Sequence, residues 1–137
     1  MSTTNFGLDR YKVERKPIAD GSIVLELPHL PPSTNHLYFN LPGGGRAKTA
    51  KYADWIKTAG LFLNSQIKGR VTGRVEIRIL VEDCHPQRDA SNVTKPVEDL
   101  LVRCGVIEDD RSKFVRGSGS YFADIKGVRI EITKVTA

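Results

Sequence analysis

Cysteine is scarce in this chain of 137 residues, which contains only Cys84 and Cys104 and no CxxC pair. Two separated cysteines exclude a disulfide framework and a cysteine-rich zinc site. The three histidines, His29, His36 and His85, lack metal-ligand spacing, so we expect surface or core roles for them. No signal peptide and no long apolar run is present either. We therefore expect a reduced, cytoplasmic protein with no membrane partner.

Acidic residues are in the minority. Lysine and arginine number 21 against 16 aspartates and glutamates, a formal charge of +5. This excess favours an anionic partner such as nucleic acid, while an anionic membrane surface and a merely solvated basic surface remain alternatives. The GxxxxGK[ST] spacing of a phosphate-binding P-loop is absent. We therefore expect no nucleotide cofactor.

Alternating and helical periodicities divide the chain into a polar arm, residues 1–21, and one domain, residues 22–137. They predict strands at 22–27, 73–82, 113–122 and 127–135 and helices at 52–66 and 92–103. Pro96 removes a hydrogen bond early in the second helix, so the regular helix should begin nearer Lys95, after an irregular lead-in. The order β-α-β-α-β-β predicts a small α+β domain with a mostly antiparallel, mixed sheet and two main helices.

A glycine-rich segment, LPGGGRAKTAKY, follows the first predicted strand. Its composition is typical of a mobile loop, and it carries Arg46, Lys48 and Lys51. If the partner is a polyanion, these three cations, together with Arg88 and Arg111, are the expected phosphate contacts.

Acidic residues flank the second predicted helix at both ends. Asp89 precedes it, and Asp109 and Asp110 follow Gly105, which should end it. Twelve helical residues span roughly 18 Å, and the six that follow span roughly 17 Å if extended. A reversal at Gly105 would therefore return the second acidic pair to Asp89. Lys95, one turn into the helix, would lie beside them.

Clustered carboxylates repel one another, and a bound cation relieves that repulsion. Oxygen ligands without cysteine or histidine favour Mg²⁺ or Mn²⁺, the metals of many nucleases. An ordinary alternative stays open at this point. Ser91 or Asn92 could cap the helix, Asp89 could favour its dipole, and Lys95 could pair with Asp99 four residues on.

The segment RDASNVTKPVEDLLVRCGVIEDDR, residues 88–111, resembles the signature of the RusA family of Holliday junction resolvases, R-D-x-D-N-x-x-K followed by D-x-L, a glycine and D-D. The alignment needs no gap. LPHLPPSTNHLY is similar to the early P-P-S-x-N loop of that family, and KGVRIEIT to its closing strand. The likeness covers residues 23–133.

The resemblance implies a homodimer that resolves four-way DNA junctions by paired, Mg²⁺-dependent nicks in recombination and repair. It implies Asp89 and Asp110 as catalytic acids, Lys95 as the essential cation, Asp109 as a further metal ligand and Asn35 as a DNA contact. Two sites related by a two-fold axis suit two symmetric nicks.

Ser91 departs from the family pattern, because it stands where the family has a second aspartate. A hydroxyl is a poorer Mg²⁺ ligand than a carboxylate. The alternative to an active nuclease is therefore a junction-binding module with weak or lost catalysis. A metal-free domain with no DNA role is a third interpretation.

Overall fold

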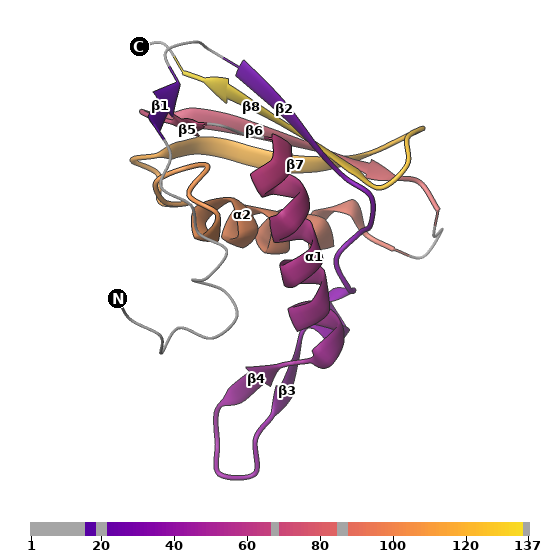
Figure 1. The fold of residues 1–137 in the computed structure, drawn as a ribbon. Coiled ribbons are helices and arrows are strands. Elements are labelled where there is room, and N and C mark those ends of the chain that lie inside the picture. Colours follow the sequence, from indigo (N-terminus) through magenta and orange to yellow (C-terminus); the bar gives the residue numbers. More distant parts are fainter. Residues whose placement is uncertain (1–15, 19–21, 67–68, 85–87, 136–137) are drawn as a thin grey trace.

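The computed structural model describes residues 16–18, 22–66, 69–84 and 88–135. Its centre is a four-stranded sheet in the order β2-β8-β6-β7. The central strand β8 pairs antiparallel with β2 and β6, and β6 pairs parallel with the edge strand β7. Figure 1 shows both long helices on one side of this sheet. The strands are β2 (Ser22–Leu27), β6 (Val75–Glu82), β7 (Val115–Ala123) and β8 (Val128–Lys134), and the helices are α1 (Ala50–Gln66) and α2 (Thr94–Arg103).

The expected α+β architecture is confirmed: a mostly antiparallel, mixed sheet with two main helices. The strand at 22–27 has the expected bounds, and α1 begins two residues before the expected 52. The irregular lead-in to the second helix is a 3-10 turn, η3 (Ala90–Val93), which runs into α2 at Thr94. Proline is tolerated at position 96 because it lies in the first turn, where a backbone N–H has no helical partner.

Five shorter elements correct the sequence-based predictions. The segment Arg46–Lys48, expected in a mobile loop, forms β4 and pairs antiparallel with β3 (Tyr38–Asn40). Part of the expected N-terminal arm, Lys16–Ile18, forms β1 and pairs parallel with the unexpected strand β5 (Gly69–Val71). The rest of the arm, residues 1–15 and 19–21, lies outside the described residues. A further 3-10 turn, η2 (Thr34–His36), precedes β3.

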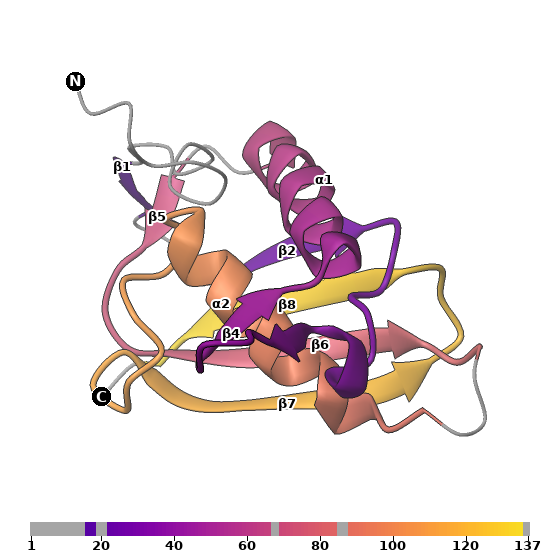
Figure 2. The same ribbon diagram turned by 90° about the horizontal axis from the view of Figure 1, so that it is seen from below.

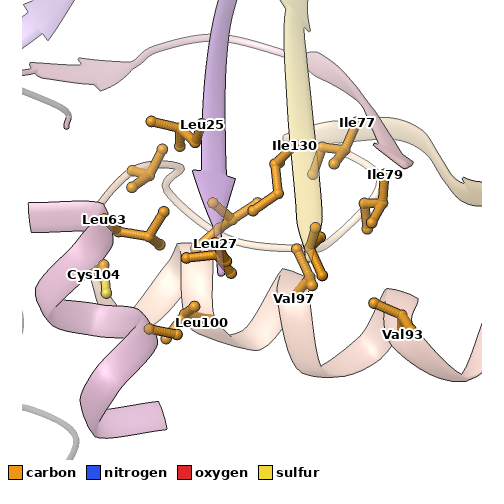
Figure 3. Packing of buried hydrophobic residues seen from close by; sticks show 14 of the residues in the cluster. Leu25, Leu27, Leu63, Ile77, Ile79, Val93, Val97, Leu100, Cys104 and Ile130 are labelled. Carbon is orange, nitrogen blue, oxygen red and sulfur yellow. The ribbon is translucent and has the colours of Figure 1, made fainter. Parts of the chain in front are cut away.

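The core lies between the sheet and the two helices (Figure 3). Alternate residues of β6 and β8 point into it, because successive side chains of a strand face opposite sides. Leu63 of α1, Val97 of α2 and Ile130 of β8 are each 0% exposed. Burying an aliphatic side chain of this size contributes roughly 1.5–3 kcal/mol. No helix in the described ranges is both long and apolar enough to cross a membrane.

Candidate functional site

Asp89 begins the candidate site as the N-cap of η3. Its backbone is extended, with φ −93° and ψ 128°, and its Oδ1 accepts a hydrogen bond of 3.2 Å from the Ser91 amide. The cap is therefore the aspartate, not Ser91 or Asn92. Asp89 is an exposed residue, so its carboxylate is open to solvent at the start of the helical segment.

Gly105 reverses the chain at the other end of α2. Its φ of 73° is a left-handed conformation that suits glycine. The Gly105 amide donates to Val102 O at 3.1 Å and the Val106 amide to Leu101 O at 2.9 Å, the two bonds of a Schellman motif. The return segment is not extended as expected. It is a series of turns, with Val106 and Ile107 buried, and Val106 O accepts a hydrogen bond of 2.9 Å from Val71 of β5.

The return brings Asp110 to Lys95, in the first turn of α2, and the expected meeting of the second acidic pair with Asp89 stays a prediction. Lys95 Nζ lies 2.8 Å from Asp110 Oδ2 and 3.1 Å from Asp99 Oδ1. The hydrogen bonds to these two carboxylates raise the pKa of Lys95 above its ordinary value. Both arrangements inferred for Lys95 are thus present, namely the pair four residues apart and the contact with the distant acid.

Glu98 adds a third carboxylate beside this pair. Its Oε2 accepts a hydrogen bond of 2.9 Å from Ser118 Oγ on β7. Burial raises the pKa of Glu98, and the nearby charges of Asp110 and Asp99 add to this effect, while Ser118 and Lys95 oppose it. Negative charge is thus concentrated around the single ammonium of Lys95.

Ser118 and Ser120 hold the edge strand β7 against α2. Their role was not predicted from the sequence. Thr94 and Ser120 share a hydrogen bond of 2.6 Å between hydroxyl oxygens, next to the Ser118–Glu98 bond. In the register of β6 and β7, Ser118 pairs with Ile77 and Ser120 with Ile79, so both serines face the helix side of the sheet. The two serines at alternate positions of VRGSGSYF could have indicated a polar contact on one face of this strand.

Asp109 is held within its own turn. Its Oδ1 accepts the Asp110 amide at 2.7 Å, and its Oδ2 lies 2.6 Å from Nε of Arg111. These contacts lower the pKa of Asp109, with the Asp110 amide as the largest cause. Arg111, predicted to contact DNA, is therefore an exposed cation already paired with an acid.

The predicted metal ligands are all carboxylates, and carboxylate oxygens are the hard donors that Mg²⁺ prefers. Asp89 caps η3, which leads into α2, and Asp110 reaches Lys95 in the first turn of α2. The Lys95 ammonium lies between Asp110 and Asp99, the position that a cation takes among carboxylates. In the part of the chain that the structure describes, no three acidic, histidine or cysteine side chains converge closely enough to hold a metal. The metal site remains a prediction.

Among the residues predicted to contact DNA, Arg88 is partly buried, whereas most of the others lie at the surface. Arg88 is half-buried, and its guanidinium donates to the Pro31 carbonyl, which ties the PPSTN loop to η3. Burial lowers the pKa of Arg88, and its buried Nε has no partner in the described structure. Asn35 in η2, Arg46 on β4 and Lys51 at the start of α1 are exposed.

Tyr38 anchors the β3–β4 hairpin to the helices. Its ring lies 4.5 Å from the Arg46 guanidinium and 6.0 Å from Lys48 Nζ, and it packs edge-on against Tyr52 at 5.7 Å. Tyr52 in turn stacks on Trp55 at 6.3 Å, and burial raises the pKa of Tyr52 to about 12. This chain of rings was not predicted from the sequence.

The hairpin base lies close to the helix that carries Lys95. The pKa of Lys48 is lowered by burial and by the charge of Arg103 on α2, and Asp99 opposes this shift. Asp99 thus interacts with Lys95 on one side and Lys48 on the other. Figure 2 shows the hairpin, α1 and α2 on the same side of the sheet.

No protein-family model matches the chain, and no curated protein matches it.

Proposed function

We propose that the chain is a Mg²⁺-dependent, structure-specific endodeoxyribonuclease of the RusA type, a homodimer that resolves four-way DNA junctions by paired symmetric nicks in the cytoplasm. The observation that carries the proposal is the contact of 2.8 Å between Lys95 and Asp110. These two residues are 15 positions apart, and both fall on the RusA-like motif. In a surface turn without a function, no particular contact between an acid and this lysine would be expected.

The residues have distinct roles in the proposed reaction. Asp89 and Asp110, with Asp109 beside them, would hold Mg²⁺ or Mn²⁺. The bound metal supplies a more acidic water and offsets charge on the scissile phosphate. Lys95 presents a compact cation to a phosphate oxygen and balances the charge that develops there. Glu98 and Ser118 position this part of α2 against β7.

The alternative proposal is a junction-binding module with weak or lost catalysis. One observation favours it, namely the serine at position 91, where the RusA-like motif has an aspartate. Under this alternative the ammonium neutralises the site and the acids act structurally. A basic surface would still bind DNA, because phosphate contacts need no metal.

The two proposals separate in a nicking assay on a synthetic four-way junction, with and without Mg²⁺. Asp89→Asn and Asp110→Asn should each abolish nicking while junction binding stays the same or tightens, because each removes a metal ligand and some repulsion toward phosphate. Asp124→Asn is a matched control, since Asp124 is exposed between β7 and β8, apart from the RusA-like segment. Nicking by either site variant at the parental rate would contradict the proposed site. A parent that binds junctions but never nicks them would favour the binding module.

A further inference from the structure

The β3–β4 hairpin projects from the body of the protein beyond the N-terminal end of α1 (Figure 1). Phe39 pairs with Ala47 across it, while Tyr38 pairs with Lys48 and Asn40 with Arg46. Neighbouring pairs face opposite sides of a strand ribbon. One side therefore carries Phe39 and the other carries the cations.

The apolar side is unusually exposed. Phe39 is 50% exposed, and Leu41, which directly follows β3, is 40% exposed. Two backbone hydrogen bonds close the tip of the hairpin at Leu41, from Leu41 N to Gly45 O at 3.0 Å and from Gly44 N to Leu41 O at 3.1 Å. The φ values of Gly44 and Gly45, 101° and 80°, are left-handed conformations that glycine adopts without strain. The hairpin is thus a shaped element rather than a loose loop.

The hairpin is also rigidly seated. The hydroxyl of Thr49 accepts the Tyr52 amide at 3.2 Å, which caps α1, and donates to His36 O at 2.5 Å. The Thr49 amide donates to Leu37 O at 2.9 Å. Together with the edge-on contact between the rings of Tyr38 and Tyr52, these bonds fix the direction of the hairpin relative to α1.

Charge identifies the kind of partner. No acidic residue lies between Glu26 and Asp54, whereas this stretch carries Arg46, Lys48 and Lys51. A partner for both sides of the hairpin must offer negative charge to one side and a flat apolar group to the other. Nucleic acid offers phosphates and bases within one nucleotide, and exposed aromatic side chains stack on bases that have left the helix.

We propose that Phe39 and Leu41 form a stacking surface for an unstacked DNA base, while Arg46 and Lys48 contact phosphates on the other side of the hairpin. The hairpin then enters DNA where the duplex opens, as at a branch point. The inference rests on the proposed function for the choice of DNA as the ligand. Lys95 pairs with Asp99 at 3.1 Å, and Lys48, at the base of the hairpin, lies within reach of the charge of Asp99, so DNA held at this base would pass near the acidic cluster.

The test is a fluorescence titration of a four-way junction that carries 2-aminopurine at the branch point, in EDTA so that no strand is cut. Parent protein should raise the fluorescence as it unstacks the probe base. Phe39→Ala should weaken binding roughly 5- to 100-fold, since one aromatic–base stack has that effect, and should abolish the fluorescence rise. Phe39→Trp should retain both. Phe62→Ala is the matched control, because Phe62 is a similarly exposed phenylalanine, at 42%, on α1.

Three outcomes would overturn the inference. The first is a Phe39→Ala variant that binds and brightens the probe like the parent. The second is an equal loss of affinity for a fully paired linear duplex, because that would remove the link to unstacked bases. The third is a parent that does not bind the junction, which would also refute the proposed nuclease. A parent that binds through Phe39 yet never nicks would refute the nuclease alone.

A salt titration tests the cationic side separately. Log affinity should fall linearly with log salt concentration, and each lost phosphate contact should reduce the slope by roughly 0.9. The double variant Arg46→Ala, Lys48→Ala should therefore have a slope smaller by roughly 1.8. Lys126→Ala, on the turn between β7 and β8, should leave the slope unchanged. An unchanged slope in the double variant would remove this side of the hairpin from the interface.

Discussion

Replacing Lys95 by methionine should separate a catalytic role from a structural one. The side chain is 67% exposed and pairs with Asp110 at 2.8 Å and Asp99 at 3.1 Å. Exposed ion pairs contribute about 0.2–1 kcal/mol each, so Lys95→Met should lose no more than about 2 kcal/mol of unfolding free energy. For a domain of this size, 1 kcal/mol corresponds to a melting shift of about 3–5 °C. The variant should therefore stay folded at 25 °C.

Nicking should respond quite differently. Removing a charge that stabilises the transition state costs about 100- to 1,000-fold in rate. Single-turnover nicking of a junction at saturating Mg²⁺, with thermal melting of the same samples, measures both effects. Lys126→Met, an exposed lysine on the β7–β8 turn, is the control for loss of a surface charge. A rate within tenfold of the parent would refute the catalytic role of Lys95, and a melting loss well above 10 °C would show a structural role larger than two exposed pairs explain.

The pH dependence of stability follows from the direction of the Lys95 shift. Its pKa is raised in the folded protein, so the stabilisation is fully present below the unfolded pKa of about 10.4 and is lost as pH rises through the higher folded pKa. The melting difference between parent and Lys95→Met should therefore stay constant between pH 7 and about pH 9. A difference that disappeared within this range would contradict the assigned pairs.

Three further outcomes are expected. Gly127→Ala should lose about 2–5 kcal/mol in urea unfolding, because φ is +68° and the new Cβ would overlap the Leu27 carbonyl oxygen; Gly43→Ala, with open space around it, should unfold like the parent. Ser91→Asp should lower the Mg²⁺ concentration for half-maximal nicking, and an unshifted titration in an active parent would contradict a missing ligand at this position. Light scattering at micromolar concentration should give a dimer, with the 40% exposed Phe122 as one candidate interface residue, whereas a mass near 15.2 kDa throughout would contradict it.

The central sheet and both helices were predictable because their signals are local. Alternation in SIVLEL and VEIRILVE identifies strands with one buried face, and both segments have that burial pattern in the structure. Pro96 correctly indicated the irregular start of α2, and Gly105 its end. In each case a residue constrains its own backbone or its near neighbours.

The candidate site was predictable in part. The length of the helix and the reversal at Gly105 predicted that Asp109 or Asp110 would return to Asp89, with Lys95 beside them. The structure brings Asp110 to Lys95, in the first turn of α2, while the meeting with Asp89 stays a prediction. The details of the return were wrong, because Val106 and Ile107 are drawn into the core and the segment turns instead of extending. Burial against β5 decided this, and β5 itself was not foreseen.

By itself, the sequence determined the elements with strong periodicity, the excess of basic charge and the spacing of the acids around α2. Only the tertiary structure decided that β7 runs parallel to β6, that Arg46 belongs to a strand, and that Arg88 turns inward to Pro31, 57 residues away. The physical reason is that these features depend on partners distant in the chain. Periodicity records which face of an element is buried, but it carries no record of what lies against that face.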